Sequence, residues 1–101
     1  MKYVDIGNLS LEIKWTEPAN RDLHQVEAYV FIDRPTSAVQ VVLDIIDHAD
    51  ILKDHPEFGR VGRRKGTREL VFGKLPFILV DRIRGEIIEI LRVLHTSRKW
   101  P

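Results

Sequence analysis

The hydrophobic pattern of this chain changes its period at a glycine-bearing segment over 54–66. Before this segment, apolar residues recur every three or four positions along two long stretches, which indicates helices. After it, apolar stretches are short, alternate with polar residues and are separated by turns, which indicates strands. The chain is therefore predicted to join a helical first half to a sheet that its second half forms.

The first half is predicted to hold one strand and a hairpin of two helices. Thr16 is suited to cap a helix over 17–32, and Pro35 ends that helix because proline disfavours helical geometry in the residue before it. Thr36 or Ser37 can cap the second helix, and the short connection predicts an antiparallel pair. The preceding strand is marked by three alternating apolar residues, Leu11, Ile13 and Trp15.

Three strands are predicted after the loop, over 68–72, 77–82 and 86–94, with short turns that favour antiparallel hairpins. The last strand is apolar on both faces, which predicts a central strand that is covered on both sides. The fold class is therefore α+β, with the order β-α-α-β-β-β and a helical hairpin on a small, mostly antiparallel sheet. Strict alternation puts Ile88, Ile90 and Leu94 on one face and Ile87, Leu91 and Val93 on the other.

Composition limits what the chain can do. Its 101 residues suit one domain, predicted over 11–101 after an extension over 1–10. The absence of cysteine excludes disulfides and thiolate sites and fits a cytoplasmic location, and no apolar run approaches a membrane span. Residues 1–59 carry 5 Lys and Arg against 11 Asp and Glu, whereas residues 60–101 carry 11 against 4. This split predicts a basic surface that meets a polyanion or an acidic partner.

Four segments of the second half carry a family likeness: HPEFGRVGR (55–63), GTRELV (66–71), PFILV (76–80) with Arg82, and ILRVLH (90–95) followed by Arg98, Trp100 and Pro101. Upstream, Trp15-Thr16 and Asp22-Leu23 add to it. In this order the segments resemble the toxins of the RelE/ParE family, one half of type II toxin–antitoxin pairs.

The resemblance implies a growth-arresting toxin that a cognate antitoxin neutralises, in a hetero-oligomer, without a cofactor. The His-x-x-Arg-x-Trp-Pro ending is similar to ParE-type chains, which inhibit DNA gyrase without a hydrolytic site of their own. RelE-type chains instead cleave mRNA on the ribosome, and this alternative stays open. A relative that is a non-toxic binding module is a third reading. The apolar helix residues over 39–46 predict surface that the antitoxin covers.

The candidate catalytic residues apply only to the ribonuclease reading. A metal-free ribonuclease needs a group that transfers protons near neutral pH and cations that stabilise charge on the phosphate, which suits His95 with Arg68, Arg92 and Arg98. In a regular strand, however, His95 and Arg92 point to opposite faces, so that only a strand end or a bulge unites them. RelE-type ribonucleases usually carry an arginine where this chain has Phe77 and a tyrosine where it has His95. ParE-type chains often carry a tyrosine in place of Asp81.

The candidate target-binding residues are basic and lie in the second half. Arginine and lysine in a loop suit contact with nucleic acid or with an acidic protein surface, and a solvated loop is the alternative. No spacing of His, Asp or Glu resembles a metal site. The predicted contact residues are Arg60, Arg63, Arg64, Lys65, Arg68, Arg98, Lys99 and Trp100.

Overall fold

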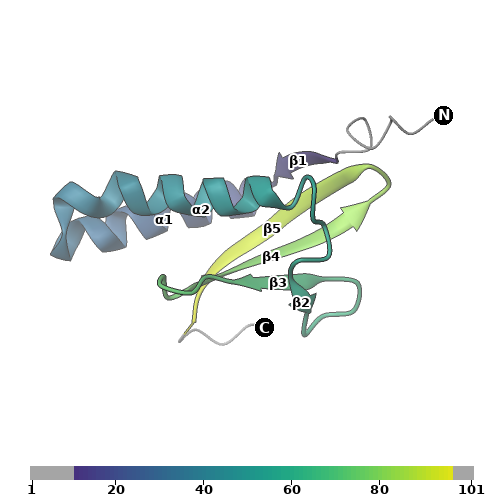
Figure 1. Cartoon of the computed structure of the whole chain (residues 1–101). Helices are drawn as coiled ribbons and strands as arrows, with labels where there is room; N and C mark the ends of the chain where they lie inside the picture. Colours follow the sequence, from purple (N-terminus) through teal and green to yellow (C-terminus); the bar gives the residue numbers. More distant parts are fainter. Residues whose placement is uncertain (1–10, 97–101) are drawn as a thin grey trace.

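The computed structural model describes residues 11–96, in which two helices pack on one face of a five-stranded sheet (Figure 1). The predicted α+β order is confirmed, and one short strand is added inside the predicted loop. The predicted extension over 1–10 and the residues 97–101 lie outside the described range. The elements are β1 (Glu12–Trp15), α1 (Glu17–Asp33), the 3-10 turn η2 (Pro35–Ser37), α2 (Ala38–Ile51), β2 (Arg60–Val61), β3 (Arg68–Val71), β4 (Phe77–Arg84) and β5 (Ile87–His95).

The strand order is β1-β5-β4-β3-β2, so β5 lies inside the sheet, as its apolar faces predict. β1 runs parallel to β5, from the pair Glu12 and Ile87 to the pair Trp15 and Ile90. The other neighbours are antiparallel hairpins, in agreement with the short turns between them. Gly85 has a φ of +60°, a backbone conformation that favours glycine, and it forms the tight turn between β4 and β5.

Thr16 joins the first strand to the first helix, and its predicted role as the helix cap is confirmed. Its side-chain oxygen accepts a hydrogen bond from the Ala19 backbone N–H at 3.4 Å. The same hydroxyl donates to the Ile90 carbonyl at 2.7 Å, and the Thr16 backbone N–H reaches that carbonyl at 3.1 Å. One residue therefore fixes both the start of α1 and its position over β5.

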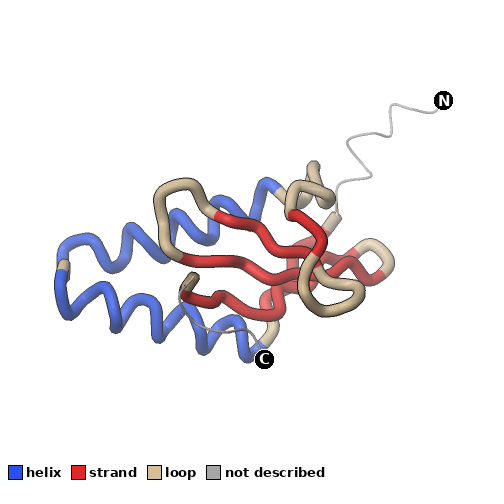
Figure 2. The backbone as a smooth tube through the Cα atoms, turned by 90° about the horizontal axis from the view of Figure 1, so that it is seen from below, coloured by secondary structure: helices blue, strands red, loops and turns tan. Residues whose placement is uncertain are grey.

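The two helices form an antiparallel hairpin whose connection lies beyond the end of the sheet (Figure 2). α1 ends at Asp33, and the Arg34 backbone N–H donates to the Val30 carbonyl at 2.8 Å, after which Pro35 begins the 3-10 turn. Ser37 occupies the capping position of α2, but its side chain makes no capping hydrogen bond. The predicted location of the second helix is thus right, whereas the capping contact is not made.

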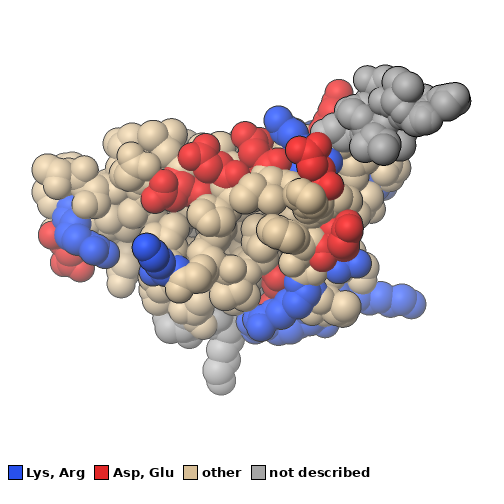
Figure 3. Space-filling view, viewed as in Figure 1, with Lys and Arg blue, Asp and Glu red and all other residues tan. Residues whose placement is uncertain are grey.

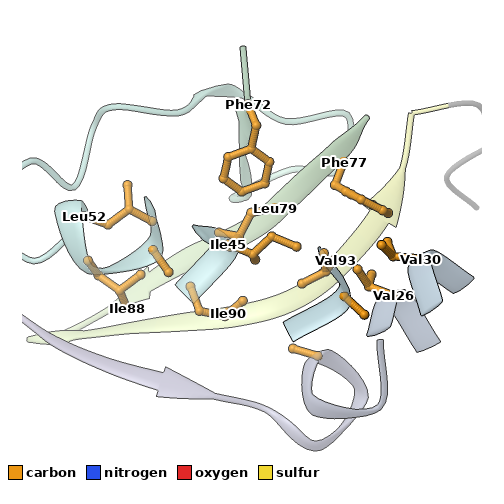
Figure 4. Packing of buried hydrophobic residues seen from close by; sticks show 13 residues of the cluster. Val26, Val30, Ile45, Leu52, Phe72, Phe77, Leu79, Ile88, Ile90 and Val93 are labelled. Atoms are coloured by element: carbon orange, nitrogen blue, oxygen red, sulfur yellow. The ribbon is translucent and has the colours of Figure 1, made fainter. Parts of the chain in front are cut away.

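The main core lies between the helices and the sheet, and its side chains interdigitate from all the layers (Figure 4). A second, smaller cluster of Ile78, Val80 and Leu94 occupies the opposite face of the sheet, with Leu91 packed against it. β5 therefore contributes apolar side chains to a hydrophobic cluster on each face of the sheet, as the sequence predicts. The main core consists of Ala19, Val26, Val30, Ala38, Ile45, Ala49, Leu52, Phe72, Phe77, Leu79, Ile88, Ile90 and Val93.

A bulge in β5 corrects the predicted assignment of its faces. Val80 pairs with Arg92, whereas the next residue of β4, Asp81, pairs with Ile90, so that Leu91 is an extra residue. An extra residue shifts the alternation of side chains by one position. Val93 consequently joins the main core, and Leu94 joins the cluster on the opposite face, the reverse of the prediction.

Element boundaries differ from the predictions at the strand ends. The strand predicted over 77–82 extends to Arg84, and the one predicted over 86–94 runs from Ile87 to His95. The strand predicted over 68–72 ends at Val71. Within residues 11–96, no helix has both the length and the apolar character that crossing a membrane requires.

Candidate functional site

A pocket of about 270 Å³ opens between α1 and the ends of β4 and β5. One wall comes from four α1 residues at spacings of three and four, which share one side of a helix. The other wall comes from the first residue of β4 and from two residues of β5 that follow the bulge. The lining residues are Asp22, Gln25, Val26, Tyr29, Phe77, Val93 and His95.

The imidazole of His95 lies between two aromatic rings of this pocket. Its ring centroid is 5.8 Å from that of Tyr29 and 5.4 Å from that of Phe77, and both contacts are edge-on. Such contacts between aromatic rings typically contribute about 0.5–1.5 kcal/mol beyond the area that they bury. His95 therefore packs the end of β5 as well as facing the pocket, while Tyr29 remains 56% exposed.

The base of the pocket is fixed by an ion pair between α1 and β5. Asp22 accepts hydrogen bonds from Arg92 Nε at 2.7 Å, from Arg92 Nη2 at 3.2 Å and from the Val93 backbone N–H at 2.8 Å. The hydrogen bond to Asp22 raises the pKa of Arg92 above its ordinary value. Arg92 pairs with Val80 in the sheet, beyond the last residue pair of β1 with β5, and from there its side chain reaches Asp22 on α1.

The charged residues separate onto two parts of the surface. Acidic side chains gather along the helical layer, and basic side chains gather toward the β2–β3 end of the sheet (Figure 3). The sequence-level division of charge therefore corresponds to a spatial one. The β2–β3 end would therefore attract an acidic partner, or one that carries phosphates, more strongly than the helical layer would.

The basic loop, defined here as Arg60–Lys65, is folded down onto the sheet by one buried carboxylate. Glu69 is 3% exposed, and its oxygens lie 3.6 Å from Arg60 and 3.5 Å from Arg63. The Arg63 backbone N–H also donates to Glu69 at 3.1 Å. Two cations of the predicted contact set are therefore partly neutralised within the chain. Their side chains are still 63% and 50% exposed.

Gly62, inside the basic loop, and Gly66, directly after it, occupy positions that other residues would not fit. A Cβ added to Gly62 would overlap the hydroxyl of Thr67, and Gly66 has a φ of +82°. Thr67 also donates to the Arg64 carbonyl at 2.6 Å. These contacts account for glycine at both positions.

The structure does not assemble the candidate catalytic residues around one point. Arg68 pairs with Asp81 on β4, which in turn pairs with Ile90, whereas His95 pairs with Phe77 near the other end of β4. Arg68 donates to the Gly59 carbonyl at 3.0 Å. Arg98 and the predicted contact residues Lys99 and Trp100 lie outside the described residues.

Arg92 and His95 do approach the same pocket, and the reason differs from the one that the sequence suggests. A bulge after Leu94 is the expected way to unite them, but the register shift lies at Leu91. Arg92 reaches the pocket through its ion pair with Asp22, and His95 lines the pocket directly. His95 thus lines the pocket, whereas Arg92 lies outside its lining residues and is engaged by the Asp22 carboxylate.

Three pocket residues escape the sequence analysis as functional candidates: Asp22, Gln25 and Tyr29. They share the side of α1 that faces the strand ends, but an amphipathic helix is read from its apolar residues, so polar residues on that side are overlooked. An aspartate at a position where the helix is otherwise buried is the one signal that was available. Among residues 11–96, no group of three or more His, Asp or Glu side chains could hold a metal ion.

Comparison with known families places this geometry in context. Residues 13–100 match the model of the ParE toxin of the type II toxin–antitoxin system parDE. The chain is 43% identical over 89 residues to Y4kP of Sinorhizobium fredii, a protein described as a candidate toxin, with 88% of this chain and 92% of that protein covered.

Two solved structures share the fold. A chain of the chromosomal ParDE toxin–antitoxin system from P. aeruginosa aligns with a TM-score of 0.80 and 28% identity, covering 86% of this chain and 97% of that one. A chain of the toxin–antitoxin complex RelBE2 from Mycobacterium tuberculosis aligns with a TM-score of 0.65 and 26% identity, covering 85% and 98%.

Proposed function

Because this chain belongs to the ParE toxin family of type II toxin–antitoxin systems, we propose that it arrests growth by inhibiting DNA gyrase and that a cognate antitoxin neutralises it. The observation that carries the choice of gyrase is the commitment of the candidate catalytic side chains to internal contacts. Arg92 binds Asp22, Arg68 binds the Gly59 carbonyl, and the His95 ring packs between two aromatic rings. This arrangement favours a toxin that acts by binding its target.

The basic end of the sheet is the surface that we assign to the target. It presents the basic loop, with Arg64 and Lys65 exposed at its tip and Arg60 and Arg63 held by Glu69. A loop that is tied down loses little conformational entropy on binding, which improves affinity for a given set of contacts. Arg68 lies at the base of this loop, and Arg98, Lys99 and Trp100 complete the proposed contact set.

The helical layer is the surface that we assign to the antitoxin. Apolar side chains remain exposed on both helices, among them Phe31 at 59%, Ile32 at 79% and Val39 at 58%. Exposed apolar side chains that lie close together mark protein interaction sites more often than solvated surface. The structural likeness to chains of the ParDE system and of the RelBE2 complex supports an antitoxin as the partner.

A supercoiling assay with purified protein tests the choice of target. We expect inhibition of gyrase by the wild-type chain, and weaker inhibition by the double variant Arg64→Glu, Lys65→Glu. Loss of one close charge contact typically costs about 2–5 kcal/mol, or a factor of roughly 30 or more in affinity. Lys74→Glu is the matched control, because Lys74 is exposed in the turn between β3 and β4.

His95 distinguishes this proposal from the alternative of ribosome-dependent mRNA cleavage. The alternative is favoured by one observation, the position of His95 in a pocket whose other polar groups are Asp22, Gln25 and Tyr29. A gyrase inhibitor should keep its potency in His95→Gln, provided that its melting temperature is unchanged. A ribonuclease should lose about a hundredfold or more in cleavage rate, the usual scale for a general acid or base. Intact gyrase activity together with mRNA cleavage would overturn the proposal.

A further inference from the structure

Asp81 is a carboxylate in the middle of the sheet that no other group satisfies. It is 0% exposed, and neither of its oxygens has a hydrogen-bond partner among residues 11–96. Its strand neighbours are Arg68 on β3 and Ile90 on β5, and residues that pair directly across strands point to the same face. Because Ile90 belongs to the main core, Asp81 faces the helical layer. Burial raises its pKa to about 6, which the charge of Arg68 partly opposes.

Arg68 is the charged group that acts on Asp81, and its guanidinium donates a hydrogen bond elsewhere. Its Nη1 donates to the Gly59 carbonyl at 3.0 Å. On β5 the residue opposite Asp81 is the apolar Ile90, and the core residues of α2 are apolar as well. Within residues 11–96, Arg68 is the one group whose charge acts on Asp81. The partner that an ionised Asp81 needs is therefore the same side chain that holds Gly59.

Gly59 lies directly before the basic loop, Arg60–Lys65. It directly precedes β2 and is buried, and a Cβ added there would lie 3.1 Å from the Glu69 carbonyl oxygen and 3.2 Å from Arg68 Cβ. Gly59 therefore lies close to β3, and the hydrogen bond from Arg68 to its carbonyl holds it there. Losing the Arg68 hydrogen bond would leave the pairs of β2 with β3 to hold this end of the loop.

We propose that Asp81 and Arg68 form a proton-controlled latch on the basic loop. When Asp81 is protonated, Arg68 donates to the Gly59 carbonyl and holds the loop against β3. When Asp81 loses its proton, Arg68 turns toward the carboxylate and Gly59 is released. A buried carboxylate without a partner is costly, so a change of side-chain conformation that supplies one is favoured once the charge forms.

The latch would change state between acid and neutral pH. Since the pKa of Asp81 is about 6, the loop is held in acid and loosened near neutral pH. The basic loop is the surface proposed above to contact the target, and the latch would set how readily it adapts. The latch itself rests only on contacts within the chain, so it can be tested without gyrase or antitoxin.

An NMR titration of the wild-type chain tests the latch directly. The observed signals are the carboxyl carbon of Asp81, the Arg68 Nε–H and the amides of Gly59 and Gly62, followed between about pH 4 and pH 8 to bracket the pKa of Asp81. We expect all of them to shift with one common midpoint, about pH 6. The proposal is wrong if the Asp81 carbon titrates with a midpoint that the Gly59 amide does not share.

Asp81→Asn supplies the second arm, because asparagine imitates the protonated side chain. Its loop amides should keep their low-pH positions across the whole range. Asp47→Asn is the matched control, since Asp47 is an exposed aspartate on α2, and it should titrate like the wild type. His55 stacks on Phe58 near the loop, so His55→Gln completes the set. A loop transition that survives Asp81→Asn and disappears in His55→Gln would overturn the latch. Should Asp81→Asn fail to fold, the wild-type titration decides.

Discussion

Replacing Asp81 by asparagine should change how the stability of this fold depends on pH. The folded chain binds the Asp81 proton more tightly than the unfolded chain does, with a pKa of about 6 against an ordinary value of 3.8. For an acid with a raised pKa, stability is highest below the unfolded pKa and is lost as pH rises through the folded pKa. The wild type should therefore lose stability between about pH 4 and pH 6, and Asp81→Asn should not share that loss.

The size of the effect follows from the two pKa values. A difference of roughly two pKa units corresponds to about 3 kcal/mol, because one unit is worth about 1.4 kcal/mol. Pairing with Arg68 after ionisation would recover part of this energy, so about 3 kcal/mol is an upper value. Since small domains are typically stable by about 5–15 kcal/mol, the effect is a large part of the total.

Urea unfolding followed by circular dichroism measures this difference. The free energy of unfolding of the wild type and of Asp81→Asn is determined at a series of pH values, with Asp47→Asn as the control. Groups that titrate equally in both chains cancel in the difference, which isolates Asp81. The difference should grow in favour of asparagine as pH rises and level off above about pH 7. Parallel stability curves at all pH values would refute the assignment of an uncompensated carboxylate.

Three further predictions concern contacts that hold the elements together. Thr16→Val should destabilise the fold by about 1–2 kcal/mol, because the cap and the hydrogen bond to the Ile90 carbonyl are both lost; Thr16→Ser, which keeps them, should cost less in the same urea assay. Asp22→Ala should cost about 3–5 kcal/mol, since it removes the carboxylate that binds Arg92 and the Val93 backbone N–H, and a smaller cost in an Arg92→Met background would confirm the coupling. Glu69→Gln should raise hydrogen exchange at the Arg63 amide while the core strands keep their protection; unchanged exchange there would argue against the clamp.

The fold could be predicted largely because local signals agree with one another. Thr16 as a cap, the proline after α1 and the alternating strands each indicate an element, and together they leave one arrangement for the helical hairpin. The short strand β2 escaped because two residues, Arg60 and Val61, carry no period of their own. It pairs with β3, where Glu69 also forms ion pairs with Arg60 and Arg63.

The candidate site was harder to predict because a single extra residue in β5 changes which side chains meet. Alternation counts positions, and a bulge at Leu91 alters the count for every residue after it. The faces of Val93 and Leu94 were assigned the wrong way round for this reason. Arg92 also binds Asp22, a contact between residues 70 positions apart in sequence that no local pattern could reveal.

The bulge also connects the two features that most distinguish this chain. On the β5 side it is followed directly by Arg92, which binds Asp22 on α1, so that the arginine expected to stabilise a phosphate instead anchors a helix. On the β4 side it lies next to Asp81, the buried carboxylate without a hydrogen-bond partner. Arg92 is bound by Asp22. Within residues 11–96, Arg68 is the one cation whose charge acts on Asp81. Arg68 already holds the Gly59 carbonyl, so the basic loop and the buried carboxylate draw on the same side chain. Because of this competition, Asp81 should influence the loop that we assign to target binding, although its own side chain is buried.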